Sequence, residues 1–131
     1  QEAGMNTIMV PVSVGELVDK ITILEIKAER ITQEERRRNV GVELGGLLPL
    51  WQGLAEQAPA LEPLKLQLRA VNERMWDVQD ALRAKEAAQD FGAEFVELAR
   101  AVAARNGERI GIKNEINRLA GSQFVEEKQY R

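Results

Sequence analysis

Residues 13–31 read SVGELVDKITILEIKAERI, and this stretch carries the clearest helix signal in the chain. Ser13 and Glu16 form a capping box, in which each side chain bonds a backbone N–H of the first turn. Apolar residues then recur every three or four positions: Val14, Leu17, Ile21, Leu24, Ala28 and Ile31. This spacing predicts a stiff helix over residues 14–31 with one apolar stripe.

Three further segments repeat the same apolar spacing, with short breaks between them. Thr32 and Glu35 form a second capping box and predict that the next helix begins there. The third segment, about residues 60–88, has the most regular stripe: Leu61, Leu64, Leu68, Val71, Met75, Val78 and Leu82. The fourth ends at Gly121, a typical C-cap residue. Short connections make neighbouring helices antiparallel, so the sequence predicts an all-α up-down bundle, coiled-coil-like, with about four long helices.

Two places interrupt this pattern. Glycines and Pro49 weaken the second helix, since Gly costs roughly 1 kcal/mol and Pro roughly 3 kcal/mol inside a helix. We therefore expect a kink or break near Gly45–Pro49. Asn106–Gly107 is a turn signal, so the fourth helix is either one interrupted rod or two pieces.

The whole chain, residues 1–131, is expected to be one helical domain. Residues 1–12 form a lead-in that contains Pro11 and is expected to pack beside the bundle as an extended segment. Gln1–Gly4 precede a methionine; they are either an upstream extension or residues foreign to the natural protein, and the fold prediction leaves them out. Residues 122–131 are expected to form a tail that docks through Phe124 and Val125.

Composition excludes several functions. The chain contains no cysteine and no histidine, which removes thiolate nucleophiles, the commonest general base and the commonest transition-metal ligand. The net charge of −3 and the single basic run at residues 36–38 argue against nucleic-acid binding. The sequence shows no apolar run long enough to span a membrane and no signal peptide, so a cytoplasmic location without cofactors is expected.

Acidic pairs spaced three apart are the first candidate site. Glu16 and Asp19 share a face of the first helix, and Asp77 and Asp80 share a face of the third. Facing pairs of this kind hold Mg²⁺ in all-α nucleotide pyrophosphohydrolases, which these pairs resemble. However, Asp19, Asp77 and Asp80 lie off the apolar stripes of their helices. Solvated faces are therefore favoured over a metal site.

Basic residues in the fourth helix are the second candidate. If the helix is continuous, Arg105 and Arg109 extend its apolar stripe inward and Lys113 lies close beside them. Such a cationic layer has to pair with carboxylates or bind an anionic ligand. If Asn106–Gly107 breaks the helix, these residues face water, and the strength of Asn-Gly as a breaker favours this alternative.

Ile23 and Ile26 are the third feature. They lie on the side of the first helix away from its main stripe. A helix that is apolar on two sides is central in its bundle or lies at a subunit interface. Ile23 and Ile26 are therefore candidates for a homodimer interface.

Two resemblances accompany these patterns. Asp19-Lys20-Ile21, Leu24 and Ala28-Glu29-Arg30 resemble the first helix of all-α chorismate mutases, which implies a carboxylate-binding role for Arg30. Residues 10–31, together with VNERMWDVQDALRAKE, FVELARAV, IKNEIN and GSQFVEEKQY, resemble a small bacterial family of unknown function. That resemblance implies a free-standing helical protein with a loose association with cell-surface polysaccharide pathways.

The leading hypothesis is a non-enzymatic helical interaction or scaffold protein that forms a homodimer or binds another protein. It rests on continuous apolar stripes and on the lack of any nucleophile beside a base. The alternative is a bundle that binds or converts a small anionic metabolite through Arg105, Arg109 and Lys113, together with Arg30.

Overall fold

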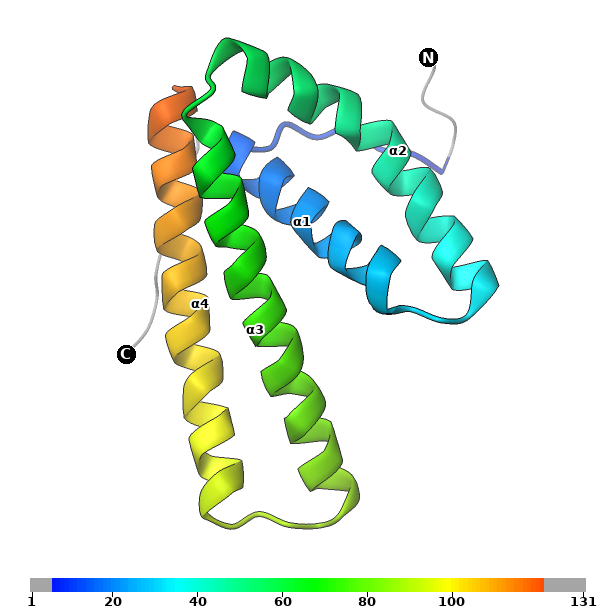
Figure 1. Ribbon diagram of the computed structural model, residues 1–131, viewed down its shortest axis with the longest axis vertical. Coiled ribbons are helices and arrows are strands. Elements are labelled where there is room, and N and C mark those ends of the chain that lie inside the picture. The colour runs from blue at the N-terminus through cyan, green and yellow to red at the C-terminus, as the bar shows by residue number, and fades with distance from the viewer. Residues whose placement is uncertain (1–5, 122–131) are drawn as a thin grey trace.

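The computed structural model describes residues 6–121, and within them it contains helices and no strand. The helices are α1 (Val14–Arg30), α2 (Glu34–Gln57), α3 (Leu61–Ala87) and α4 (Ala93–Ala120). Consecutive helices run in opposite directions (Figure 1). The all-α helical bundle predicted from the sequence is confirmed.

The helices form two hairpins that meet at one end. The α3–α4 hairpin is the longer, and the α1–α2 hairpin leaves it at an angle from its upper end (Figure 1). Helix α1 packs against each of the other three helices. A helix that is apolar on more than one side is expected at such a central position.

The core lies where the two hairpins meet. It consists of buried residues from all four helices: Val18, Ile21, Trp51, Leu61, Leu68 and Ile116. Further along α3 and α4, towards their connection at residues 88–92, buried residues give way to half-buried and exposed ones. The packed centre therefore coincides with the first half of α1.

The two predicted capping boxes have different outcomes. The hydroxyl of Ser13 accepts a hydrogen bond from the Glu16 N–H at 3.1 Å, which confirms the start of α1. The second box at Thr32 and Glu35 is wrong, because α2 begins after Gln33 and no side chain caps it. The chain leaves α1 in an extended conformation at Ile31 and stays extended at Gln33, so Thr32 is one residue too early to cap.

The break expected near Gly45–Pro49 is absent, because α2 is one continuous helix from Glu34 to Gln57. Pro49 has no N–H to donate to the Gly45 carbonyl. Both residues lie on the exposed side of α2, where water can bond that carbonyl. Packing of Trp51 and its apolar neighbours on the other side outweighs the helix propensity of this segment.

The break favoured at Asn106–Gly107 is also absent. Helix α4 continues through both residues and ends at Gly121, whose left-handed φ of 67° confirms the predicted C-cap. The residues that follow the Asn-Gly pair are held against α1, with Lys113, Ile116 and Asn117 buried. This tertiary packing overrides a local penalty of roughly 1 kcal/mol for glycine.

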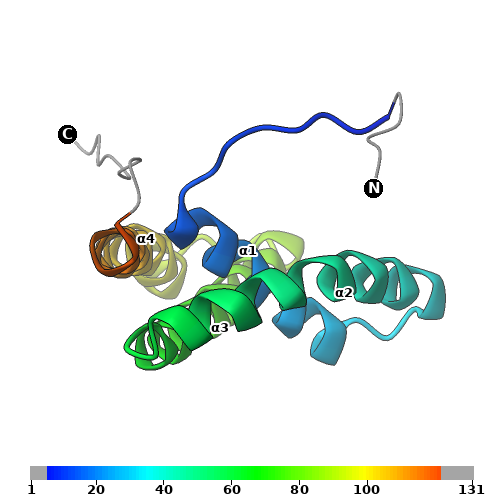
Figure 2. The same ribbon diagram turned by 90° about the horizontal axis from the view of Figure 1, so that it is seen from above.

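The lead-in differs from its prediction. We define it here as residues 7–12; it is extended as expected, but it does not pack beside the bundle. Its backbone runs away from the start of α1 (Figure 2), and although its last residue, Val12, borders α1 and α2, residues 8–10 are exposed. Its apolar side chains are exposed: Ile8, Met9, Val10 and Val12.

Several expectations fall on other parts of the chain. Gln1–Gly4 and the docking of the tail through Phe124 and Val125 lie outside the described residues. No helix within residues 6–121 is long and apolar enough to cross a membrane.

Candidate functional site

The first turn of α1 lies directly against α4. The Gly15 N–H donates to the side-chain oxygen of Asn117 at 2.7 Å. A first-turn N–H has no partner within its own helix, so a residue of the last helix caps the first one. A Cβ atom at position 15 would lie 2.5 Å from the Lys113 carbonyl oxygen, and this close approach requires glycine.

One turn further, Asp19 is the centre of a buried polar group. Its side chain is only 2% exposed. The guanidinium of Arg109 in α4 donates its Nε–H to Asp19 Oδ1 at 2.9 Å and a second hydrogen to Oδ2. This two-bond geometry is the strong form of an arginine–carboxylate pair.

Helix α3 contributes an amide to the same group. Asn72 Nδ2 donates to Asp19 Oδ1 and to the Thr22 hydroxyl, each at 2.9 Å. The Thr22 hydroxyl in turn donates to the Asp19 carbonyl at 2.8 Å. Asp19 thereby joins α1 to α3 as well as to α4.

Lys113 lies one turn beyond Arg109 on α4 and is buried. Its ammonium donates to Glu16 Oε2 at 2.9 Å and lies 3.9 Å from Asp19 Oδ2. Glu16 is half-buried, so this second pair is partly open to solvent.

We call the six residues that join the three helices in this way the polar junction: Glu16, Asp19, Thr22, Asn72, Arg109 and Lys113. The expectation that Asp19 points into solvent is wrong, because α1 is central and has helices on more than one side. The expectation that a break exposes Arg109 and Lys113 is also wrong, because α4 is continuous. Within the junction the two cations are paired with two carboxylates, as buried charge requires.

The other predicted cations lie elsewhere. Arg105 is half-buried and pairs with Glu108 at 2.6 Å. Arg30 is exposed; it donates to Asp77 at 2.6 Å and lies 5.7 Å from the centre of the Trp76 ring. The hydrogen bond to Asp77 raises the pKa of the Arg30 guanidinium. The position matched to a substrate-binding arginine thus holds a carboxylate of its own chain.

The acidic candidates are separated as well. Glu16 and Asp19 belong to the polar junction, whereas Asp77 pairs with Arg30 and Asp80 pairs with Arg83 on exposed surface. Within residues 6–121 no group of three or more acidic side chains could hold a metal ion.

The apolar pair on α1 has a divided outcome. Ile26 is 1% exposed and packed inside the chain, so the prediction that it meets a second subunit is wrong. The central position of α1 in the bundle explains its burial. Ile23 is half-buried and lines a cleft.

This cleft, which we call the α1/α3/α4 cleft, lies beside the polar junction and has a volume of about 250 Å³. The residues that line it come from three helices: Ile23, Ile26 and Lys27 from α1, Asn72, Met75, Trp76 and Gln79 from α3, and Arg109 from α4. The charged residues among them are a lysine and an arginine, and none is a carboxylate. Of the four predicted cations, Arg109 alone lines it.

Sequence reasoning missed Asn72, Thr22, Gly15 and Asn117. Asn72 follows Leu68 by four residues, so a polar side chain at an inward position was a signal that could have been read. Asn117 similarly follows Lys113 by four. Gly15 offered no such signal, because only the assembled fold shows what lies above it.

No curated protein and no solved structure matches the chain. The model of a family of unknown function, DUF6165, matches residues 8–131. This match covers nearly all of the chain, including every residue of the polar junction and of the cleft, and the chain belongs to that family.

Proposed function

We propose that the protein is a non-catalytic helical binding protein whose α1/α3/α4 cleft takes a small anionic metabolite with a flat apolar body. The carrying observation is that Lys27 and Arg109 line the cleft and no carboxylate does; because Arg109 is paired with Asp19, Lys27 supplies the charge that attracts an anion. Lys27 is half-buried and makes no ion pair with any residue in 6–121. A lysine held in that way favours a ligand that carries negative charge.

The other lining groups suit such a ligand. Ile23, Met75 and Trp76 offer apolar surface, and Asn72 and Gln79 offer amides. Small-molecule sites typically combine an apolar lining with a few fixed polar groups. Arg109 is one of these fixed groups, since both carboxylate oxygens of Asp19 hold its guanidinium.

Binding without conversion is supported by the same residues. No nucleophile beside a general base lines the cleft. The buried carboxylate nearby, Asp19, accepts hydrogen bonds from Arg109 and Asn72 and holds the helices together. The cytoplasmic location and the association with polysaccharide pathways stay predictions.

The two tryptophans provide the test. Trp76 lines the cleft, whereas Trp51 is buried in the core. We expect benzoate, phenylacetate or phenyl phosphate to shift the indole N–H resonance of Trp76 in NMR spectra and to leave that of Trp51 in place. No shift at Trp76 with any of these probes at about 10 mM, the weak limit of small-ligand binding, would contradict the proposal.

A charge variant sharpens this test. Lys27→Gln removes a charged hydrogen bond worth about 1.5–3 kcal/mol, so we expect binding to weaken about tenfold or more. Arg100→Gln is the matched control, because Arg100 is exposed on α4 and does not line the cleft. Equal affinities of the two variants would show that the cleft is not the binding site.

A second candidate function, a helical interaction protein, is favoured by a different observation. The lead-in and the surface beside it are apolar and exposed. This part of the molecule lies at the start of α1, away from the Ile23 and Ile26 surface on which the dimer prediction rested.

A further inference from the structure

The lead-in is an apolar segment that its own chain leaves uncovered. Ile8 is 83% exposed, Met9 79% and Val10 65%. Three consecutive apolar side chains at such exposure form a patch of the kind that marks interaction sites. Pro11 follows them and keeps Val10 out of the helical region, so the segment stays extended.

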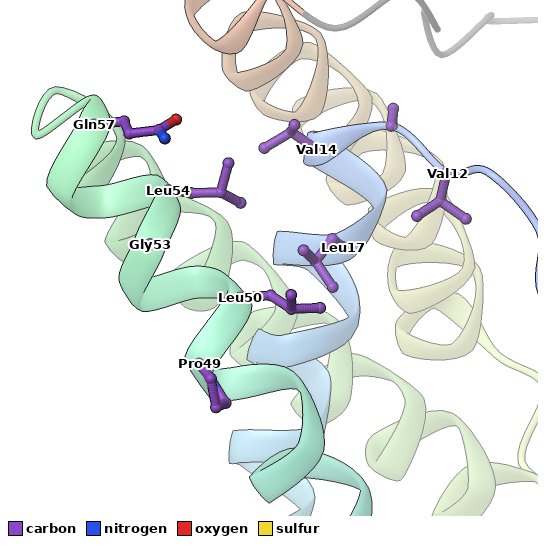
Figure 3. A pocket seen from close by; sticks show the side chains of 9 residues that line it. Val12, Val14, Leu17, Pro49, Leu50, Gly53, Leu54 and Gln57 are labelled. Atoms are coloured by element: carbon purple, nitrogen blue, oxygen red, sulfur yellow. The ribbon is translucent and has the colours of Figure 1, made fainter. Parts of the chain in front are cut away.

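A groove lies beside the point where the lead-in joins α1. It has a volume of about 430 Å³ and is lined chiefly by apolar residues of α1 and α2. Leu17 of α1 and Leu50 and Leu54 of α2 point into the space between the two helices (Figure 3). No charged residue lines this groove, and Leu50 is 55% exposed.

We propose that two copies of the chain form a symmetric dimer in which residues 8–10 of each lead-in occupy the groove of the other copy. The lead-in and the groove match in chemistry, since residues 7–12 (TIMVPV) and the groove lining both lack charge. Burial of one in the other removes apolar surface from water and leaves no charge unpaired.

The place where the lead-in joins α1 favours a second copy of the chain as the occupant of the groove. Val12 belongs to the lead-in and also lines the groove, so the segment departs at the edge of the groove. Residues 8–10 do not line the groove of their own chain. In a two-fold symmetric dimer each copy offers one lead-in and one groove at the same place. Both grooves are then filled, and the assembly stops at two copies.

The oligomeric state is the first test. We expect light scattering after size exclusion to show a dimer at about 100 μM, a concentration at which interfaces of modest area are occupied. Leu50→Asp and Ile8→Asp should each weaken the dimer about tenfold or more. Val42→Asp is the matched control, because Val42 is 74% exposed on α2 outside the groove, and it should leave the dimer intact.

Cross-linking then identifies the contact, since the chain contains no cysteine of its own. A mixture of Val10→Cys and Leu50→Cys chains should form a disulfide-linked pair on oxidation, whereas Val10→Cys with Val42→Cys should not. A monomer at about 100 μM would overturn the proposal. An intramolecular disulfide in the Val10→Cys/Leu50→Cys double variant, without linked pairs in the mixture, would also overturn it and assign the groove to the chain's own lead-in. A monomer whose lead-in binds phosphatidylcholine vesicles would overturn it in favour of a lipid surface.

Discussion

The polar junction and the far end of the α3–α4 hairpin both join helices through charged residues, yet their surroundings differ. At the junction, Asp19 is buried and bonded by two helices. At the far end, the half-buried Lys85 pairs with Asp90 and Glu94, which are both exposed. Water screens the exposed pairs and replaces them readily, whereas a buried partner cannot be replaced. An ion pair therefore contributes strongly to stability at the polar junction and very little at the far end of the α3–α4 hairpin.

The largest effect is expected from Asp19→Ala. This change removes the buried carboxylate that Arg109, Lys113 and Asn72 share, and breaking a buried ion pair costs about 3–5 kcal/mol. Urea unfolding at neutral pH, followed by circular dichroism, measures the change in free energy of unfolding. Asp80→Ala removes an exposed carboxylate paired with Arg83 and should cost about 0.5 kcal/mol or less. Similar losses in free energy of unfolding for the two variants would show that the buried and the exposed ion pairs contribute equally to stability.

Gly15→Ala should have the next largest effect. The added Cβ would lie 2.5 Å from the backbone oxygen of Lys113, which cannot move aside as a side chain can. We expect a loss of about 1–3 kcal/mol, the usual range for overpacking. Gly41→Ala in α2 is the control, because nothing lies within 4 Å of its Cβ position. If alanine is tolerated equally at both positions, the contact between the first turn of α1 and α4 is looser than described.

A smaller effect of opposite sign is expected from Gly107→Ala. Gly107 lies inside α4, and an added Cβ there meets no atom within 4 Å. Because alanine is the better helix former, stability should rise by about 0.5–1 kcal/mol. The midpoint of thermal unfolding reports the change. A decrease would mean that the segment is not helical in solution and would restore the break that the sequence favours.

The smallest effect concerns pH at the far end of the hairpin. The Lys85 ammonium and then the Gly92 N–H lower the pKa of the Asp90 carboxyl below its ordinary value of 3.8. A lowered folded-state pKa stabilises the fold above the unfolded-state pKa, and this stabilisation is lost as pH falls through the folded value. Carboxyl NMR titration should therefore show the Asp90 pKa rising in Lys85→Met. In Lys27→Met, which leaves the loop untouched, the Asp90 pKa should not move.

The regular apolar spacing made the fold predictable, because a helical stripe depends only on local sequence. The continuity of α2 at Gly45–Pro49 and of α4 at Asn106–Gly107 was not predictable in that way. Glycine and proline do lower the helix propensity of these segments, but the cost amounts to a few kcal/mol. Packing of Trp51 and Ile116 further along the helices outweighs that cost.

The site was predictable in part. Extension of the stripe on α4 placed Arg105 and Arg109 inward with Lys113 close beside them, although the alternative of a broken helix was favoured. In the structure Lys113 is buried, Arg109 bonds Asp19, and Arg105 pairs with Glu108 instead. The carboxylate partner of Arg109 was missed, because Asp19 lies off the main apolar stripe of α1. The apolar pattern of one helix does not show which helices pack against its other side. Asn72 was missed for another reason, because its inward position four residues after Leu68 was a signal that was not used.

The bond between Gly15 and Asn117 has a consequence for the order of folding. The two residues are 102 positions apart, whereas α3 and α4 are joined by a short connection. Contacts between close segments form sooner than contacts that close a long loop. During synthesis α1 therefore leaves the ribosome with Asp19 and Glu16 unpartnered, because Asn72, Arg109 and Lys113 follow much later in the sequence. Only when the last turns of α4 emerge can α1 form its bond to Asn117 and take its final place.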